Sequence, residues 1–284
     1  MIKIRVPATS ANLGPGFDCL GLALDIYNTY EVTPANELSF EGVDQRYCNE
    51  DNLFVQAYRK AGGQGNFHLS VHSGIPVSRG LGSSASLYAA GALSALASLQ
   101  EIDYDRLFQI TADLEGHPDN AAPAVYGGLT ANMKGTHGWI SRQLPIHESL
   151  CFTALIPDVE ISTEEARGIL PADYPRRVAA ANAGKAVLMT EALRCGDIAL
   201  LREAAKDEIH EPYRRTLIPG FDTVKKTAEE DSGGVLVISG SGSTCLLIAD
   251  RYLGETAKSD IFSLTDHWKI MEPKIGRGAE LLGE

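Results

Sequence analysis

Alternating apolar and polar positions predict a sheet in the first half of the chain. Residues 2–6 and 67–73 alternate in the way that is typical of half-buried strands. The same pattern recurs elsewhere in this half, where turn-forming residues separate the stretches. Further strands are therefore expected at residues 19–24, 27–33, 37–40, 128–133 and 139–144.

Three helices are expected in the same half. Residues 87–99 are small and apolar on nearly every face, which predicts a buried helix. Residues 53–61 follow Asn52, a residue type that often starts helices, and they end at a pair of glycines. Residues 104–114 have the period of an amphipathic helix. Residues 121–125 are expected to be a short link to the next strand.

The pattern changes near Pro145. Beyond it, apolar strands and helices follow the order expected for an α+β domain, with helices on one face of an antiparallel sheet. We divide the chain into residues 1–145 and 146–284 and expect the active site at the interface between them. In the second part, strands are expected at residues 150–156, 234–239, 244–249 and 268–271, and helices at about 177–194, 197–207, 222–230 and 254–262.

The composition is that of an ordinary globular protein. With 284 residues, of which 44% are apolar and 22% charged, the chain can bury a large core. The formal net charge is −12. This charge argues against a general binder of nucleic acids or anionic membranes, because such proteins need a basic face.

The cysteines and the first residues indicate a reducing cytoplasm. The five cysteines are scattered and form no Cys-x-x-Cys pattern, so neither a zinc site nor a disulfide framework is indicated. Residues 1–7 lack the apolar core of a signal peptide. No apolar run approaches the length that a membrane-spanning helix needs.

Residues 76–86, Pro-Val-Ser-Arg-Gly-Leu-Gly-Ser-Ser-Ala-Ser, are the candidate phosphate site. They lie between an expected strand and an expected helix, and glycines let the backbone approach an anion closely. The N–H groups and the dipole of a helix start favour phosphate, and Arg79 adds a positive charge. The stretch is not a Walker A loop, because no Gly-Lys-Ser/Thr follows at the required spacing. In the alternative interpretation, Ser83 or Ser84 only caps the helix.

Residues 7–18 are a second candidate binding loop. They are rich in glycine, proline and small residues, and they carry the polar side chains of Asn12 and Asp18. The length of the loop and its polar side chains favour a binding role. A tight connection between two strands is the alternative.

Three separated segments, residues 7–18, 80–84 and 239–244, resemble the three motifs of the GHMP kinases. This family includes kinases of galactose, homoserine, mevalonate and phosphomevalonate. The first segment, Pro-Ala-Thr-Ser-Ala-Asn-Leu-Gly-Pro-Gly-Phe-Asp, looks specifically like the homoserine kinases. The resemblance runs from the first residues to about residue 249. The same specific likeness is found at residues 116–124, 162–171 and 211–219.

The resemblance implies a two-domain α+β fold with an N-terminal nucleotide-binding α/β domain and a C-terminal ferredoxin-like domain. It also implies a reaction in which ATP, with Mg²⁺, phosphorylates the side-chain hydroxyl of L-homoserine to O-phospho-L-homoserine, a step towards threonine. The implied partners are L-homoserine and ATP, without nucleic acid or membrane. A homodimer is expected from the family.

The resemblance also assigns a nucleotide site. Ser84 and Glu115 match the Mg²⁺ ligands of the family, and both offer the hard oxygen donors that Mg²⁺ prefers. A solvated residue at a helix end is the alternative for Glu115. Asn52 matches a position near the adenine, where a helix cap is the alternative. The residues implied to bind ATP are Asn52, Pro76, Val77, Ser78, Arg79, Gly80, Leu81, Gly82, Ser83, Ser84, Ala85 and Ser86.

Homoserine carries a carboxylate, an ammonium group and the reacting hydroxyl, so its site needs three kinds of partner. Arg167 and Arg214 match the substrate arginines of the family, and a guanidinium pairs with a carboxylate through two hydrogen bonds. Asp18 would hold the ammonium group. The implied substrate site comprises Asn12, Asp18, His117, Asn120, Thr163, Arg167 and Arg214, and the implied catalytic residues are Ser84, Glu115, Asn120 and Arg167.

Asp119 is the alternative choice for a general base. Mevalonate kinases and their close relatives use an aspartate together with a lysine, but no matching lysine stands in the first motif of this chain. The resemblance to the homoserine kinases implies that Asn120 lies beside the hydroxyl instead. A strong base is dispensable in that case, because phosphoryl transfer passes through a loose transition state.

Two other functions remain open from the sequence. The first is a GHMP kinase that acts on a mevalonate-type alcohol or a sugar. Such a substrate has no ammonium group and would leave Asp18 unpaired, so the residues favour an amino acid. The second is a catalytically silent sensor of ATP or an amino acid. The complete set of phosphate-loop, metal-ligand and substrate residues argues against it.

Overall fold

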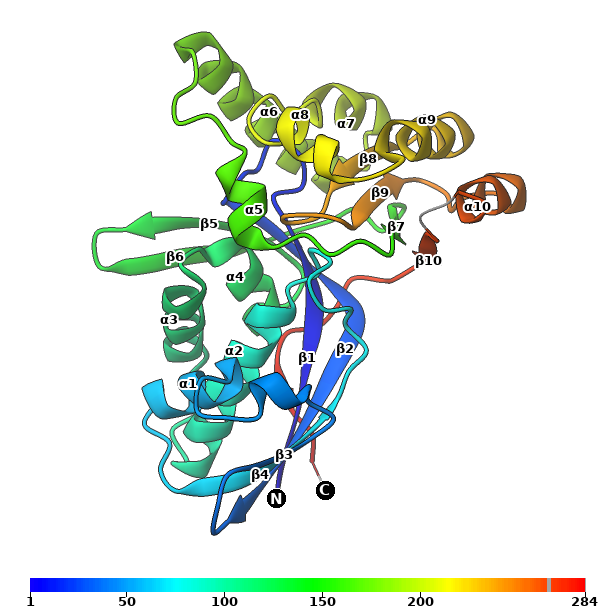
Figure 1. Cartoon of the computed structure of the whole chain (residues 1–284). Coiled ribbons are helices and arrows are strands. Elements are labelled where there is room, and N and C mark those ends of the chain that lie inside the picture. The colour runs from blue at the N-terminus through cyan, green and yellow to red at the C-terminus, as the bar shows by residue number, and fades with distance from the viewer. Residues whose placement is uncertain (265–266, 284) are drawn as a thin grey trace.

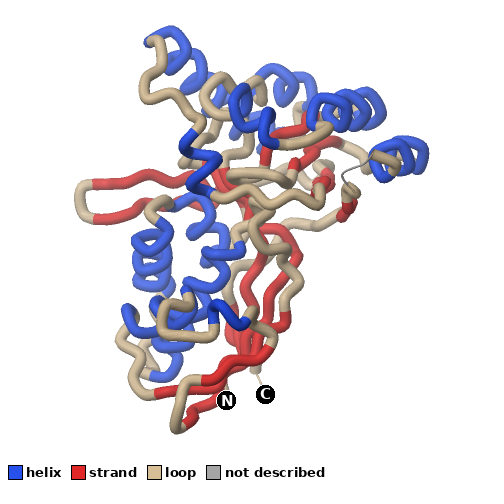
Figure 2. The backbone as a smooth tube through the Cα atoms, viewed as in Figure 1, coloured by secondary structure: helices blue, strands red, loops and turns tan. Residues whose placement is uncertain are grey.

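The computed structural model describes residues 1–264 and 267–283. Figure 1 shows two groups of elements stacked on each other: a large sheet with helices beside it, where both chain ends lie, and a smaller sheet with its own helices. In the first group the helices cover one face of the sheet, which Figure 2 shows as a column of helices beside the strands.

The larger sheet has seven strands. Its main path runs in the order β11-β1-β2-β4-β3, and β5 and β6 extend it from β2. Among the strands that the structure describes, only β3 and β4 pair in parallel. The strands are β1 (Ile2–Ala11), β2 (Leu20–Ala35), β3 (Ser39–Glu41), β4 (Asn66–His72), β5 (Leu129–Gly135), β6 (Gly138–Leu144) and β11 (Glu280–Leu281).

The two strands expected at residues 19–24 and 27–33 form one long strand, β2. Pro7 of β1 pairs with Tyr27, and the next residue, Ala8, pairs with Leu24, so two residues of β2 are left over at this point. Such a bulge bends the strand without ending it. The break in the alternation that suggested two strands is therefore a register shift.

Four helices and one 3₁₀ turn accompany this sheet. The core between them is apolar and aromatic: Phe54 of α1 packs against Tyr30 of β2 and Phe67 of β4, with ring centroids 5.8 and 5.7 Å away. The helices are α1 (Leu53–Lys60), α2 (Ser83–Ser98), α3 (Tyr104–Glu115) and α4 (Pro118–Tyr126), and the turn is η1 (Gln45–Tyr47).

The prediction that residues 121–125 are a link is wrong, because they belong to α4. Two prolines hid this helix. Pro118 occupies the first turn, where a missing N–H costs nothing, whereas Pro123 lies inside the helix and leaves the carbonyl of Asp119 without its usual donor. That carbonyl lies against Gly21 of β2, where a Cβ would overlap it. The glycine allows α4 to pack directly on the strand.

The smaller sheet is antiparallel, in the order β10-β7-β9-β8. Its strands are β7 (Cys151–Ile156), β8 (Val235–Ile238), β9 (Cys245–Ala249) and β10 (Lys269–Met271). The helices of this part are α5 (Thr163–Gly168), α6 (Arg176–Cys195), α7 (Ile198–Ala204), α8 (Glu211–Arg214), α9 (Phe221–Ser232) and α10 (Glu255–Phe262), and a 3₁₀ turn, η2 (Arg215–Leu217), follows α8.

The expectation of helices on a single face of this sheet is wrong. On one face, Val237 and Leu246 join a core that contains Met189 of α6 and residues of β2. On the other face, Leu236 and Leu247 pack with residues of α9 and α10. Because both faces are covered, every residue of β8 and β9 is buried, which explains the continuous apolar runs in the sequence.

The last residues of the chain return to the first sheet. Ile275 and Arg277 form single bridges to Leu24 and Gly127, and β11 pairs with β1. The division of the chain near Pro145 stays a prediction. The structure shows in addition that the C-terminal segment returns to the sheet of the first part. None of the described helices is both long and apolar enough to cross a membrane.

Candidate active site

The three motif segments, which are far apart in the sequence, meet at one cavity of about 590 Å³. The N–H of Gly240 donates to the carbonyl of Ala11 (3.0 Å), and the hydroxyl of Ser239 donates to the carbonyl of Gly80 (2.6 Å). The N–H of Thr9 donates to the carbonyl of Leu81 (3.0 Å). These bonds join the first loop, the glycine-rich loop and the third segment into one unit.

The glycine-rich loop needs its glycines. Gly80 and Gly82 have positive φ angles of 73° and 66°, and a Cβ on either residue would overlap Ser239 or Thr9. Gly82 is the N-cap of α2, and no side chain caps this helix. The alternative that Ser83 or Ser84 serves as the cap is therefore wrong. The first-turn N–H groups of α2 remain available to an anion at the cavity.

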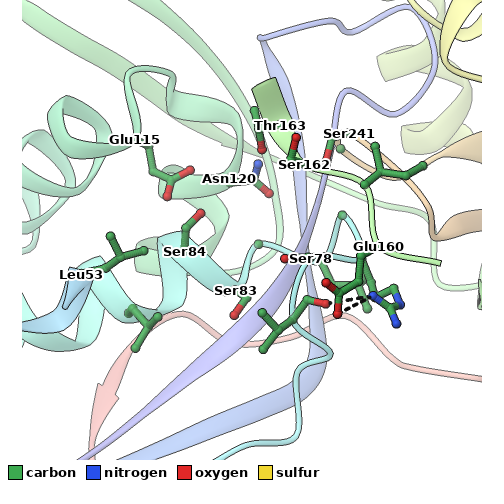
Figure 3. Close-up of a pocket in the computed structure, with 18 of the residues that line it drawn as sticks. Leu53, Ser78, Ser83, Ser84, Glu115, Asn120, Glu160, Ser162, Thr163 and Ser241 are labelled. Atoms are coloured by element: carbon green, nitrogen blue, oxygen red, sulfur yellow. Dashed lines mark hydrogen bonds and ion pairs between the residues drawn. The ribbon is translucent and has the colours of Figure 1, made fainter. Parts of the chain in front are cut away.

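Arg79 does not supply free positive charge to this loop. Its guanidinium contacts Asp158 at 2.9 Å and Glu160 at 3.3 Å, and Figure 3 shows Glu160 at the cavity with its ion pair dashed. Both acidic residues follow β7, so the pair joins the two parts of the chain. The charge of a bound triphosphate has to be balanced mainly by the helix start and by a metal ion.

Glu115 and Ser84 face each other beside the start of α2 (Figure 3). The side chain of Glu115 is 5% exposed, so the alternative of a solvated helix-end residue is wrong. Burial raises the pKa of Glu115, although a hydrogen bond with Ser84 opposes this effect. Among the described residues, Oε1 of Glu115 has no hydrogen-bond partner.

This pair fits a Mg²⁺ ion. A buried carboxylate oxygen without a partner, next to a hydroxyl and a phosphate loop, offers the oxygen ligands that Mg²⁺ prefers. Within the described part of the chain, no three His, Cys, Asp or Glu residues cluster into a site of their own. The remaining ligands of an ion held here would be phosphate oxygens and water, as is usual for Mg²⁺ with nucleotides.

The start of α4 brings three polar side chains to the cavity. Nδ1 of His117 lies 2.8 Å from Oδ1 of Asp119, and the same oxygen accepts the N–H of Asn120. Burial opposes the charged form of His117, but the bond to Asp119 raises its pKa above the ordinary value. Oδ1 of Asn120 accepts the hydroxyl of Thr9 (2.7 Å), which leaves the amide NH₂ of Asn120 to face the cavity.

Two arginines and an aspartate form the charged end of the cavity. Arg167 binds Asp18 through two hydrogen bonds of 2.7 and 3.1 Å. Arg214 is only 2% exposed and donates to the carbonyls of Ala166 and Gly240. Burial and the neighbouring Arg167 lower the pKa of Arg214. The hydrogen-bond acceptors of this buried guanidinium are neutral carbonyl oxygens. Its positive charge is therefore suited to an anionic ligand.

Comparison with known proteins agrees with this geometry. Residues 52–128 match the GHMP kinases N terminal domain, and residues 189–263 match the GHMP kinases C terminal domain. A homoserine kinase of Clostridium botulinum (strain Langeland) is 38% identical over 288 aligned positions, which cover 98% of this chain and 97% of the relative. The chain belongs to the GHMP kinases. Within that family it belongs to the homoserine kinases.

Solved structures give the same assignment. A putative homoserine kinase from Listeria monocytogenes superposes with a TM-score of 0.85 at 29% identity, over the whole of both chains. A homoserine kinase from Cytophaga hutchinsonii superposes with a TM-score of 0.86 at 28% identity, over 99% of this chain and 97% of the other. The expected two-domain α+β fold is confirmed. GHMP kinases use ATP, so the chain is an ATP-dependent kinase.

Most of the residues that the sequence assigned to this kinase site line this cavity. Three assigned to ATP do not: Pro76, Ala85 and Ser86 lie outside its lining. Ala85 and Ser86 are completely buried, and the hydroxyl of Ser86 lies 2.8 Å from that of Tyr30. They fall on the inner side of the first turn of α2, because the helix begins at Ser83 and not near residue 87 as expected.

Asn12 and Asn52 line the cavity, but their side-chain amide groups form hydrogen bonds with backbone groups of the protein. Asn12 accepts the N–H of Asp18 and donates to the carbonyl of Gly240. Asn52 accepts the N–H of Phe54 and donates to the carbonyl of Tyr47, so the helix-cap alternative is confirmed. Thr163 begins α5 at the rim of the cavity (Figure 3).

The sequence missed the residues that hold the kinase's arginines in place. Asp207 accepts the N–H groups of His210 and Glu211 at the start of α8, the helix that carries Arg214. Nε2 of His210 donates to the carbonyl of Gly14 (2.9 Å). The ring of His210 stacks on Phe17 (5.4 Å), over which the guanidinium groups of both site arginines also lie, at 5.2 and 5.7 Å.

The sequence also missed the loop of residues 42–47 at the opposite end of the cavity. Arg46 lies over the ring of Tyr47 at 4.9 Å, and Tyr47 is 49% exposed. Both residues line the cavity. The segment between β3 and α1 shows no periodicity, so only the tertiary structure brings it to the site.

Proposed function

We propose that this kinase transfers the γ-phosphoryl group of ATP to the side-chain hydroxyl of L-homoserine, with Mg²⁺. One observation carries the proposal: the same cavity has a phosphate loop with a metal-ligand pair and, beyond them, a buried arginine next to an Arg–Asp ion pair. A phosphate site alone fits any GHMP kinase. The added charges fit a small zwitterion that is held close to the phosphates.

The phosphate end would act mainly by position and charge. The N–H groups at the start of α2 would bind the triphosphate, and Ser84 and Glu115 would hold Mg²⁺ beside it. The ion, when bound, neutralises charge on the phosphate oxygens and aligns them for in-line transfer. Glu115 must be ionised to act as a ligand, and a nearby cation favours that form although burial opposes it.

The substrate end would bind an amino acid by its two charges. Arg214 is buried among carbonyls and would take the substrate carboxylate, a charge-assisted interaction that also satisfies the arginine. The ammonium group would bind Asp18, which already accepts two bonds from Arg167. Thr163 and His117 lie at the same end and would fix the backbone of the amino acid.

Asn120 would donate its amide N–H to the homoserine hydroxyl, because its carbonyl oxygen accepts the hydroxyl of Thr9. Asp119 would serve as a positioning residue, since one carboxylate oxygen already receives His117 and the N–H of Asn120. We infer a transfer without a strong base, in which the hydroxyl proton leaves through a phosphate oxygen or water.

Further proposals concern the location, the partners and the assembly of the enzyme. All five cysteines are free thiols, which suits the reducing cytoplasm that we propose as its location. ATP and L-homoserine are its proposed partners, and a homodimer is its proposed assembly. The net charge of −12 supports the absence of nucleic acid or anionic membrane among its partners.

The test is ADP release from Mg-ATP with L-homoserine, L-serine, L-threonine, mevalonate and galactose. We expect strong preference for L-homoserine, lost in Arg214→Ala and kept in Arg215→Ala, whose exposed side chain pairs with Asp222. Turnover of mevalonate or galactose instead would retain the kinase and discard the proposed substrate. Bound ATP without turnover on any substrate would favour a sensor.

A further inference from the structure

Residues 157–162, the β7–α5 linker, join the smaller sheet to the helix α5. They bring the chain to the cavity, where Figure 3 shows Glu160, Ser162 and Thr163. The helix that follows carries Arg167, a residue of the proposed substrate site. The position of this arginine therefore depends on how the β7–α5 linker is held.

The helix α5 needs support from outside. It has six residues, and isolated helices of this length are not stable in water. Near its C-terminal end, Arg167 binds Asp18, and the carbonyl of Ala166 accepts Nε of Arg214 (3.1 Å). Because these contacts lie at one end of α5, the other end has to be fixed through the β7–α5 linker.

The β7–α5 linker is bonded through its backbone to the phosphate side of the cavity. The N–H of Ile161 donates to the carbonyl of Ser78 (3.2 Å), and the carbonyl of Val159 accepts the hydroxyl of Ser243. Ser78 has a φ of 53°, a left-handed conformation that is unfavourable for serine. Residues in such conformations persist where their neighbours hold them, and they cluster at functional sites.

Arg79 adds the charged part of this contact. Its side chain is 14% exposed, and its guanidinium lies 2.9 Å from Asp158 and 3.3 Å from Glu160. Its backbone carbonyl accepts the N–H of Thr244 (3.0 Å). The arginine is thus bonded to the third motif segment by its backbone and to the β7–α5 linker by its side chain.

The same contacts make Arg79 a poor ligand for phosphate. To reach a triphosphate, the guanidinium would have to leave both carboxylates. Glu160 lines the cavity, so its unbalanced charge would then repel the phosphates. Two acidic residues beside a phosphate site are explained if Arg79 is their partner, and they are unexplained if Arg79 binds the nucleotide.

We propose that Arg79 is a positioning residue for the amino acid and not a ligand of ATP. By holding Asp158 and Glu160, it fixes the β7–α5 linker against the glycine-rich loop. The linker in turn places α5 so that Arg167 meets Asp18 at the substrate end. The inference rests on the proposed substrate site, because Arg79 acts through Arg167.

The main test is steady-state ADP release by Arg79→Gln at varied concentrations of each substrate. We expect KM for L-homoserine to rise about fivefold, the effect of losing a partly exposed ion-pair network, and KM for Mg-ATP to stay within about twofold of the wild-type value. An unchanged KM for L-homoserine overturns the proposal. A rise in KM for Mg-ATP that equals or exceeds the rise for L-homoserine also overturns it.

Lys258→Gln is the matched control for Arg79→Gln. Nζ of Lys258 also holds two carboxylates, those of Glu255 and Glu272, at 3.1 and 2.9 Å. Lys258 lies outside the lining of the cavity, so its loss removes a similar network from a place that bears on neither substrate. We expect both KM values of this variant to stay at the wild-type level.

Removal of the acidic partners distinguishes the two roles of Arg79 independently. We expect the double variant Asp158→Ala, Glu160→Ala to raise KM for L-homoserine as Arg79→Gln does. The triple variant should lose no more, because all three changes break one network. Losses that add in the triple variant overturn the proposal. A double variant that lowers KM for Mg-ATP and leaves KM for L-homoserine unchanged overturns it too, since a freed Arg79 would then serve the phosphates.

Amide hydrogen exchange tests the position of the β7–α5 linker without the reaction. The amide of Ile161 is bonded to the glycine-rich loop, and that of Ala166 closes the first turn of α5. We expect both to exchange faster in Arg79→Gln and to be unchanged in Lys258→Gln. Unaltered exchange over residues 157–168 in Arg79→Gln overturns the proposal.

Arg167→Ala separates a failure of this inference from a failure of the proposed function. We expect it to raise KM for L-homoserine more than Arg79→Gln does, because it removes the side chain that Arg79 positions. If Arg167→Ala leaves this KM unchanged, the proposed substrate site and the role of Arg79 are both wrong. If Arg167→Ala raises it and Arg79→Gln does not, the substrate site stands and the role of Arg79 is overturned.

Discussion

The two ends of the active-site cavity are built from different parts of the chain. At the proposed phosphate end, backbone N–H groups and glycines of one continuous segment would do most of the binding. At the substrate end, side chains from four separate segments meet: Asp18, His117, Arg167 and Arg214. The first end depends on the absence of Cβ atoms, and the second depends on charges that hold one another in place.

This difference predicts how each end fails. A backbone site loses its shape as soon as one added atom forces the loop away from its neighbours. A site of paired side chains keeps its shape when one member is changed conservatively, but it loses the specific interaction of that member. The phosphate end should therefore be sensitive to size, and the substrate end to charge and geometry.

The largest effect is expected for Gly80→Ala. The new Cβ would overlap the carbonyl of Ser239 and crowd Gly242, and a positive φ is unfavourable for alanine. We expect kcat/KM to fall by about 10³-fold or more, as loss of several kcal/mol of transition-state stabilisation would produce. The measurement is steady-state ADP release at saturating and limiting ATP.

Gly65→Ala is the control for Gly80→Ala. Gly65 has nearly the same φ, 74°, but an added Cβ meets no described atom within 4 Å. It should lose about 1–2 kcal/mol of unfolding free energy and keep its activity. If both variants lost activity equally, backbone strain rather than the contact with the third segment would control the phosphate end.

The next largest effect is expected for Arg214→Lys, the conservative change at the substrate end. Lysine keeps the charge but lacks the planar donors that reach Ala166, Gly240 and a carboxylate together. We expect KM for L-homoserine to rise and kcat/KM to fall by about 10²-fold, whereas ATP affinity stays near the wild-type value. Equal losses of ATP and homoserine affinity would show that the two ends are not separable.

The same contrast explains what the sequence could predict. The glycine-rich loop is one local segment, so its strand, turn and helix start could be recognised from neighbouring residues. The support of Arg214 could not, because His210, the residue that Asp207 holds at the start of α8, reaches Gly14 and Phe17 only through the tertiary fold. The short helices α5 and α8 are a turn or two long, which is too short for a periodic signal.

A further miss has a local cause. Prolines hid α4, since Pro123 interrupts a helix that survives because its freed carbonyl packs on Gly21. For Asn52 the cap depends on the distance to Phe54, which the sequence does not contain, and because Asn52 also lines the cavity its contact with the nucleotide stays a prediction. Family resemblance brought the site residues together, but only the structure separates those that line the cavity from those that support it.

A smaller effect is expected for Asp119→Asn. Because Asp119 receives His117 and the N–H of Asn120, it positions these residues without taking the substrate proton in our proposal. We expect kcat to fall by less than about tenfold, against at least about 10²-fold for Ser84→Ala or Arg214→Ala. Losses as large as those of Ser84→Ala would contradict transfer without a strong base. A pH–rate profile that loses its acidic limb in Asp119→Asn would contradict it independently.

The smallest effect on activity, and the sharpest test of how the substrate end is held, concerns Glu211 at the start of α8. Burial raises its pKa to about 7, although Lys225 opposes the shift, and Oε1 accepts the N–H of Ile238 at 2.8 Å. In the unfolded chain a glutamic acid has a pKa of about 4.3. Between these two values the folded state binds the proton that the unfolded state releases, so stability falls as the pH rises through that window.

Glu211→Gln should remove this dependence, because glutamine stays neutral and its oxygen can still accept the N–H of Ile238. We expect the variant to gain stability over the wild type as the pH rises from about 4 to about 7, up to about 3 kcal/mol, and the gain to level off above that. Denaturant unfolding at several pH values measures it, and Glu164→Gln, exposed on α5, is the control. If Glu211→Gln kept the wild-type slope, the group that titrates in this window would not be Glu211.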